Sequence, residues 1–335
     1  MRLLYHLTVP PSPLSACDAV VQEVHALRTH FGGDLVHLYP GRVPGTRFPR
    51  RWWGLQRLPL LLRADRRVTC HHLYNPDPYP FAVLRLLRRP IIYTAAAGVR
   101  RANPATIRAL ARHIHRLVVA TEDERAFLAT WDVTNVAVVR PGIEVGRFSY
   151  TPLPPETPPT LLMASAPWTL AQFESKGVTA LLALAQEMPD LHLVFLWRGV
   201  QADEMQRRVR AAGLEARVEV LDRQVDVNAV LARVYAAVVL AEGDALVKAY
   251  PHSLLESLAA GRPVLVSAVI PMAQDVVRQE SGLVVETLDV AHLRSAVTQL
   301  FADYARYQQN ALATRAEAWS QARVMVEYGQ LYACC

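Results

Sequence analysis

The chain has 335 residues, of which 52% are hydrophobic and 20% charged, a composition that indicates a soluble globular protein long enough for two domains rather than a disordered chain. Its four cysteines (Cys17, Cys70, Cys334 and Cys335) lack metal-ligand or disulfide-framework spacing, and no stretch approaches the roughly 20 apolar residues of a membrane-spanning helix. Because proline interrupts the N-terminal apolar stretch too early for a signal peptide, we expect a cytoplasmic protein.

The formal net charge of +6 is unevenly distributed. Residues 1–150 hold 21 arginines and 10 acidic residues, whereas the remainder holds 15 basic and 20 acidic residues. A basic half can attract an anionic lipid surface at the inner membrane face, or another polyanion, although a solvated surface explains the same charges. Aromatic residues do not interleave with the arginines as in nucleic-acid-binding surfaces, so we expect no nucleic-acid partner.

In the first half of the chain, short apolar stretches alternate with amphipathic ones. The expected strands are 3–9, 35–38, 68–73, 91–94 and 117–120, and the expected helices are 17–30, 81–87 and 105–112. Proline residues between 10 and 15 predict a turn after the first strand. This alternation is typical of a doubly wound parallel sheet.

The second half begins again with the same alternation. A linker at 149–159 contains five prolines, which favour an extended spacer. The expected strands that follow are 160–163, 191–197, 218–221 and 237–241, with helices from Lys176 onward, at 203–212 and at 227–235. We therefore predict an N-terminal domain at 1–150, a C-terminal domain at 151–318 and a final helix within 319–335.

The stretch at 246–286 organises the second half. It predicts a loop, a helix capped by Ser253, a left-handed turn at Gly261, a stop at Pro263 and the buried strand V-L-V. A helix N-terminus that follows such a loop is suited to binding phosphate, because its N–H groups and its dipole both favour negative charge.

The motif P-H-S-L-L-E-S-L-A-A-G-R-P-V, followed by S-G-L-V-V at 281–285, resembles the nucleotide-sugar site of retaining glycosyltransferases with the GT-B fold, most closely family 4 (group 1). The segment V-V-R-P-G-I-E-V-G-R-F at 138–148 is similar to the one that precedes the interdomain linker of these enzymes. The W-S-x-A pattern at 319–322 is similar to the start of their C-terminal helix, which crosses back onto the first domain. The resemblance implies an α/β protein with two Rossmann-like, doubly wound domains facing a cleft, the first for the acceptor and the second for the donor.

The resemblance also implies roles for individual residues. Lys176 matches the lysine that binds phosphate, and Glu256 matches the second glutamate of a Glu-x7-Glu pair, which accepts hydrogen bonds from ribose hydroxyls. Lys176 and Lys248 are the only lysines beside 34 arginines, so the candidate catalytic residues are Lys176, Lys248 and Glu256. The remaining donor-binding candidates are the loop and helix-start residues Pro251, His252, Ser253, Leu254 and Leu255. The alternative for Lys176 and Glu256 is that both are surface charges at helix ends.

Four features depart from the family pattern. Lys248 replaces the first glutamate of the pair, and S-A-P-W-T-L-A-Q-F-E-S-K-G lacks the arginine that accompanies the phosphate-binding lysine. The histidine that follows the mid-domain strand is absent after Thr94, and prolines replace the glycine-rich turn after the first strand. Lys248 can compensate for the missing arginine by contacting phosphate or a carboxylated sugar.

These features predict a retaining, metal-independent transferase that moves a sugar from a nucleotide diphosphate sugar to an unidentified saccharide, lipid or other small acceptor. No cofactor besides the donor is expected, because no Asp-x-Asp or His cluster stands in a metal-binding context. His71 and His72, which we expect at a strand end, are acceptor-side candidates, with a structural role as the alternative. The second hypothesis is a catalytically degenerate GT-B protein that binds or scaffolds an active transferase; a sugar-nucleotide epimerase or a phosphorylase is a third.

Overall fold

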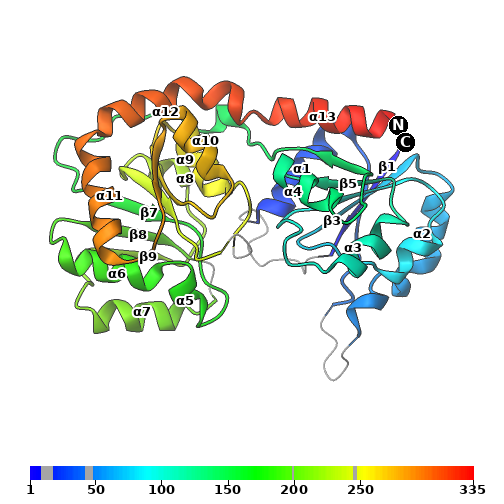
Figure 1. The fold of residues 1–335 in the computed structure, drawn as a ribbon, viewed down its shortest axis with the longest axis horizontal. Coiled ribbons are helices and arrows are strands. Elements are labelled where there is room, and N and C mark those ends of the chain that lie inside the picture. The colour runs from blue at the N-terminus through cyan, green and yellow to red at the C-terminus, as the bar shows by residue number, and fades with distance from the viewer. Residues whose placement is uncertain (9–17, 42–47, 198–199, 244–246) are drawn as a thin grey trace. The chain divides into compact units, whose positions relative to one another are not determined.

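The computed structural model describes residues 1–8, 18–41, 48–197, 200–243 and 247–335. The expected turn at 10–15 therefore lies outside the described residues. Internal contacts divide the chain into two compact units, Met1–Pro141 with Ala322–Cys335, and Gly142–Gln321 (Figure 1). The first boundary between the units falls after Pro141, whereas the sequence predicted it after residue 150.

Unit 1 (Met1–Pro141 with Ala322–Cys335) is built on a six-stranded sheet with the order β2-β1-β3-β4-β5-β6, in which neighbouring strands are parallel. The strands are β1 (Leu3–Leu7), β2 (Asp34–His37), β3 (Cys70–Asn75), β4 (Ile91–Ala95), β5 (Arg116–Val119) and β6 (Val136–Val138). Alternate residues of a strand point to opposite faces of the sheet. On β1, Leu4 belongs to the hydrophobic cluster on one face, and Leu3 and Tyr5 belong to the cluster on the other. Strands buried on both faces explain the nearly continuous apolar stretches in the sequence.

Helices cover both faces of this sheet (Figure 1). One face is covered by α1 (Ala19–Phe31) and α13 (Gln321–Ala333), and the other by α2 (Leu58–Asp65), α3 (Pro104–Ala111) and α4 (Glu122–Ala129). Three short 3-10 helices complete the described part of the unit: η2 (Arg50–Trp52), η3 (Leu55–Arg57) and η4 (Ala82–Leu86). The helix expected at 81–87 is thus a 3-10 helix.

Helix α13 contributes Val324, Met325, Tyr328 and Tyr332 to the core of unit 1. The Cys335 thiol, two residues beyond the end of this helix, lies 3.0 Å from Sγ of Cys70 on β3. The last residues of the chain are therefore packed against its first sheet.

Unit 2 (Gly142–Gln321) contains a second six-stranded parallel sheet, with the order β12-β11-β10-β7-β8-β9. Its strands are β7 (Thr160–Met163), β8 (His192–Leu196), β9 (Val218–Leu221), β10 (Ala236–Val239), β11 (Val264–Ser267) and β12 (Gly282–Val285). From the β9 edge, the strands follow the order third, second, first, fourth, fifth, sixth of the unit. The direction of winding reverses between β7 and β10, which is where doubly wound sheets bind ligands.

The helices of unit 2 are η5 (Val145–Arg147), α5 (Gln172–Ser175), α6 (Val178–Glu187), α7 (Ala202–Ala211), α8 (Val227–Leu231), α9 (His252–Ala259), α10 (Met272–Gln279), α11 (Val290–Ala302) and α12 (Tyr304–Ala318). Helices α5 to α10 connect successive strands, whereas η5 precedes the first strand, and α11 and α12 follow the last one. Two doubly wound α/β units confirm the predicted fold class. Of the helices within the described ranges, none has both the length and the apolarity that crossing a bilayer requires.

Candidate functional site

Lys176 lies at the point where the sheet of unit 2 changes its winding direction. It follows α5 and is only 5% exposed, with Nζ 3.5 Å from Oγ of Ser165 and 3.4 Å from the carbonyl oxygen of Ala166, in the loop after β7. The N–H of Glu242, in the loop after β10, donates to the carbonyl of Ser175 (2.9 Å). The structure thus brings this lysine to the two loops that border the switch point.

Gly177 explains why a glycine follows this lysine. It has a φ of +71°, and a Cβ at this position would lie 2.7 Å from a methyl carbon of Leu240, directly after β10. Any larger residue would separate the Lys176 turn from β10 and also adopt an unfavourable left-handed backbone. The K-G pair therefore sets the distance between the lysine and the strand end.

The loop after β11 joins the same edge of the sheet. The N–H of Ala241 donates to Oγ of Ser267 (3.0 Å), and the N–H of Met272 donates to the carbonyl of Ala249 (3.1 Å). Lys248, which is partly exposed, lies in the loop that these bonds hold. The carboxyl ends of β7, β10 and β11 therefore carry one connected set of loops.

The first turn of α9 corrects one sequence prediction. Pro251 is the N-cap residue, and no side-chain cap is formed, so Ser253 is the second helical residue and not the cap. Leu254 and Leu255 donate their N–H groups to the carbonyl of Pro251, at 3.0 and 3.2 Å, and their side chains are buried. The N–H of Ser253, by contrast, occupies a position in the first turn where helix geometry provides no intrahelical partner.

The remaining donor-site candidates lie around this helix start. His252 is the first helical residue, and Glu256 lies one turn further on; both are partly exposed. Topology places Lys176, Lys248 and Glu256 at the same carboxyl edge of the sheet. Within the described ranges, no group of three or more His, Cys, Asp or Glu residues could hold a metal ion.

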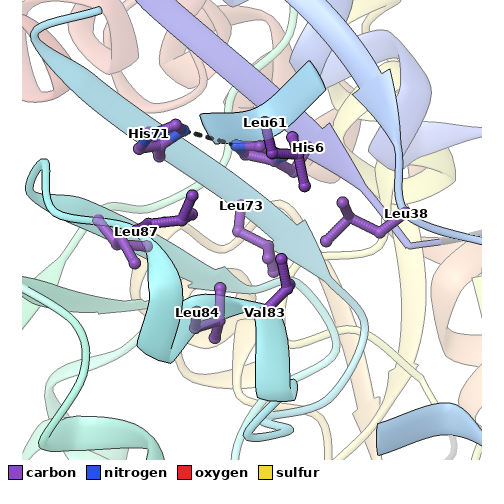
Figure 2. Close-up of a pocket in the computed structure, with 9 residues that line it drawn as sticks. His6, Leu38, Leu61, His71, Leu73, Val83, Leu84 and Leu87 are labelled. Carbon is purple, nitrogen blue, oxygen red and sulfur yellow. Dashed lines mark hydrogen bonds between the residues drawn. The ribbon is translucent and has the colours of Figure 1, made fainter. Parts of the chain in front are cut away.

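His71 lies in the interior of unit 1 and not at a ligand-facing strand end. It is the second residue of β3, at the amino end of the strand, and is fully buried. Its Nε2 lies 3.0 Å from Oδ1 of Asp65, and its Nδ1 lies 2.9 Å from Nε2 of His6 (Figure 2). Because the carboxylate accepts, His71 carries its proton on Nε2 and accepts from His6 through Nδ1.

The surroundings of this pair are apolar. The described residues around it, Leu61, Leu73 and Val83 among them, leave no room for a water molecule (Figure 2). Burial lowers the pKa of His71 below its ordinary value, although Asp65 opposes the shift. An acceptor therefore cannot reach His71 in this structure, which corrects its predicted placement.

His72 is also buried and belongs to a hydrogen-bonded chain beneath α13. Its Nδ1 lies 2.5 Å from Oη of Tyr332, and its Nε2 lies 2.9 Å from Oγ1 of Thr94. Thr94 continues the chain to Tyr328 (3.0 Å). The His72 side chain thus holds the C-terminal helix α13 on the sheet, and it does not contact an acceptor.

The buried histidines predict that unit 1 loses stability in acid. Burial lowers the pKa of His72 to about 3, and it lowers those of His6 and His71 as well, whereas an unfolded chain titrates near 6.5. Below about pH 6.5 the unfolded state binds more protons, so the free energy of unfolding falls as the pH drops toward 3. The expected slope is about 1.4 kcal/mol per pH unit for each histidine charged only when unfolded.

Urea unfolding of the full chain between about pH 5 and pH 6 measures this slope. His72→Gln should make it shallower, whereas His25→Gln, on the exposed face of α1, is the control. An identical slope for His72→Gln and wild type would contradict the prediction.

Sequence reasoning missed a polar cluster at the carboxyl edge of unit 1. Arg50 donates through Nη1 to Oδ2 of Asp77 (2.9 Å) and through Nη2 to Oδ1 of Asn75 (3.4 Å), and its guanidinium lies 4.5 Å from the ring centre of Tyr79. Asn75 donates to Oη of Tyr93 (2.9 Å). The side chains of Arg50 and Asp77 remain 35% and 40% exposed, so the cluster presents both charges to solvent. Its signal in the sequence was N-P-D-P at 75–78, which begins with the last residue of β3.

Two doubly wound parallel sheets, one in each unit, are the arrangement of the GT-B fold. The solved structures most similar to this chain include sucrose-phosphate synthase from Thermosynechococcus elongatus (TM-score 0.75, 17% identity, covering 100% of this chain and 99% of that one). They also include HepE from Anabaena in complex with UDP (TM-score 0.72, 12% identity, 100% of both chains) and WaaG, a glycosyltransferase of lipopolysaccharide biosynthesis (TM-score 0.70, 14% identity, 98% of both chains).

Residues 169–319 match the family model described as Glycosyl transferases group 1. No curated protein sequence matches the chain significantly. The chain therefore has the GT-B fold, and its residues 169–319 are similar to group 1 glycosyltransferases, as the motif at 251–264 predicted.

Proposed function

We propose that this protein transfers a sugar from a nucleotide diphosphate sugar to an acceptor. The observation that carries the proposal is the position of Lys176, a buried cation at the switch point of a group 1 glycosyltransferase domain. Ligands of doubly wound sheets bind at this point, and a lysine provides a compact charge for phosphate oxygens. HepE, which shares the fold, has been solved with UDP-glucose.

The proposed reaction assigns a task to each candidate residue. Lys176 and the N–H of Ser253 bind the diphosphate, and the dipole of α9 favours its charge. Glu256 accepts hydrogen bonds from the ribose. As the phosphate departs it gains negative charge, which these groups stabilise without a metal ion. Retention of anomeric configuration follows from the family resemblance and is part of the proposal.

The acceptor is proposed to bind at the Arg50–Asp77 cluster of unit 1. This cluster lies at the carboxyl ends of β3 and β4, the edge at which such sheets bind ligands. A carboxylate and a guanidinium side by side offer both an acceptor and donors to a hydroxylated or charged molecule. A saccharide, a lipid or another small molecule fits this chemistry. We also propose that the protein works in the cytoplasm, peripherally attached to an anionic membrane.

Turnover tests the proposed reaction directly. A panel of nucleotide diphosphate sugars is incubated with the full chain and a cell extract that supplies acceptors, and released nucleoside diphosphate is measured. Release that exceeds the extract alone, from one class of donor, is expected. A folded protein that releases nothing from any donor would contradict the proposed activity.

Lys248→Glu tests the lysine that replaces the first glutamate. We expect this variant to bind the donor about tenfold more weakly, because a carboxylate repels the diphosphate that Lys248 attracts across the loop. Lys248→Gln removes the charge without reversing it, so its affinity for the donor should lie between those of wild type and Lys248→Glu. Calorimetric titration with the donor measures the effect, and unchanged affinity in Lys248→Glu would remove Lys248 from the site.

The second candidate is a degenerate GT-B protein that partners an active transferase. It is favoured by Lys248 at the position of a family glutamate and by the missing arginine before Lys176. This candidate predicts weak or absent nucleotide binding and a stable complex with another protein. The turnover and titration experiments together separate the two candidates.

A further inference from the structure

Two free thiols meet in unit 1 although they come from distant parts of the chain. Sγ of Cys335 lies 3.0 Å from Sγ of Cys70, which precedes it by 265 residues. Cys70 is 0% exposed within the core, whereas Cys335 is partly exposed at its margin. A disulfide bond is about 2.0 Å long, so an approach of about 1 Å brings the two sulfurs to bonding distance.

The packing of α13 on β3 places these thiols together. Alternate residues of a strand face the same side of a sheet, and three such residues of β3 each contact a residue of α13 or of the segment directly after it. The three pairs are Tyr74 with Tyr328 (2.9 Å between hydroxyl oxygens), His72 with Tyr332 (2.5 Å from Nδ1 to Oη) and Cys70 with Cys335. The N–H of Cys335 also donates to the carbonyl of Tyr332 (3.2 Å), so the second pair holds the third in register.

The two thiols differ in the way that thiol–disulfide exchange requires. The hydrogen bond with Cys70 lowers the pKa of Cys335, and the charge of Arg116 acts in the same direction. The hydrogen bond with Cys335, together with burial, raises the pKa of Cys70. The partly exposed sulfur of Cys335 is therefore the one that ionises and that a reagent reaches, and the sulfur of Cys70 is buried directly beside it.

We propose that Cys70 and Cys335 form a reversible disulfide that links α13 covalently to the sheet of unit 1. The oxidant is a small disulfide compound such as oxidised glutathione. The thiolate of Cys335 attacks one sulfur of the oxidant, whose S–S bond breaks, and the first small thiolate leaves. Sγ of Cys70 then attacks Sγ of Cys335 in this mixed disulfide and releases the second small thiolate. The two protons of the protein thiols pass to the released thiolates, and the two electrons that the protein loses reduce the oxidant.

The disulfide reinforces the segment through which the chain returns from unit 2 to unit 1. Helix α13 begins at Gln321, the last residue of unit 2, and it otherwise packs on unit 1 through apolar contacts and hydrogen bonds. Disulfides in a reducing compartment are transient and respond to the redox state of their surroundings. Oxidation therefore stabilises α13 on the sheet, and reduction leaves it held by noncovalent contacts alone.

The experiment is oxidation of the full, folded chain with oxidised glutathione, followed by alkylation of the remaining thiols, digestion with trypsin and mass spectrometry. Cleavage after arginine places Cys70 in the peptide 68–85, and it places Cys334 and Cys335 together in the peptide 324–335. Linkage of these two peptides reports the disulfide. Cys335→Ser removes the proposed partner, and Cys334→Ser is the matched control, because it removes the adjacent, exposed thiol from the same peptide.

Oxidised wild type should yield the linked peptides within a single chain on a nonreducing gel. Its melting temperature should rise by roughly 5–10 °C, because closing a long ring restricts the unfolded chain. A reductant should reverse both changes. Cys334→Ser should behave as wild type does, whereas Cys335→Ser should give neither the linked peptides nor a comparable rise in melting temperature.

Three results would overturn the inference: no linkage of the two peptides in folded wild type, linkage that persists in Cys335→Ser, or linkage that disappears in Cys334→Ser. Linkage without a rise in melting temperature would contradict the stabilising role of the disulfide. Each measurement is made without a nucleotide or a sugar, so its outcome does not depend on the proposed transferase activity.

Discussion

Replacing Lys176 with alanine will lower the affinity for a nucleoside diphosphate by about 10- to 100-fold. A charge-assisted hydrogen bond contributes about 1.5–3 kcal/mol, and the burial of this lysine shields it from solvent screening. Its Nζ is already held near Oγ of Ser165 and the carbonyl of Ala166, so little side-chain entropy is lost on binding. Calorimetric titration of the full chain measures the change.

A second substitution separates binding from packing. Lys176→Met keeps most of the volume of the side chain but removes the charge, so it should lose affinity as Lys176→Ala does. The melting temperature of each variant reports whether unit 2 stays folded. If Lys176→Met bound the nucleotide as tightly as wild type, Lys176 would be a structural residue and the proposed diphosphate contact would be wrong.

Arg262→Leu will destabilise unit 2 by about 3–5 kcal/mol, because it leaves several buried carbonyl groups without a hydrogen-bond donor, at about 1–3 kcal/mol each. Arg262 is 0% exposed and donates to the carbonyls of Leu231 (2.8 Å), Ala232 (3.2 Å) and Thr151, and to Oη of Tyr304 (3.0 Å). It therefore joins the start of the unit, the end of α8 and the start of α12. Leucine would leave the carbonyls buried without this donor.

The conservative and control variants make this prediction specific. Arg262→Lys should restore only part of the stability, because one ammonium cannot match the directions that a guanidinium reaches. Arg233→Leu, nearby but with a side chain 47% exposed in a surface ion pair with Glu219, should cost no more than about 1 kcal/mol. Urea unfolding compares them, and a similar small loss for Arg262→Leu and Arg233→Leu would contradict the role assigned to Arg262.

The sequence predicted the fold because the information was local. The short apolar stretches in the sequence coincide with strands buried on both faces, and the stretches between them have the periodicity of helices. The segment G-R-P-V-L-V correctly predicted a turn followed by a strand. Gly261 has a φ of +72°, and β11 spans Val264–Ser267. Ser253 was wrong as a cap because Pro251 has the extended backbone of an N-cap, with φ −65° and ψ 126°, so the helix begins one residue before the serine.

The histidines and the unit 1 cluster could not be predicted in this way. The partner that buries His72 is Tyr332, 260 residues further along the chain, and His71 is paired with His6 across neighbouring strands. Arg50 lies in a connector without periodicity, and only the folded sheet brings it to Asp77. Local patterns therefore predicted the turn and the strand of the motif at 251–264, whereas interactions between distant segments determine the environment of unit 1.

The most direct test of the central claim is a thermal-shift panel of nucleoside diphosphates and their sugars, on wild type and on Lys176→Ala. A ligand at about a hundred times its Kd adds about 2.7 kcal/mol to the free energy of unfolding, which raises the melting temperature measurably. The account predicts a shift with diphosphates of one base that is greatly reduced in Lys176→Ala. No shift with any nucleotide, or an equal shift in both proteins, would contradict a donor site at the switch point of unit 2.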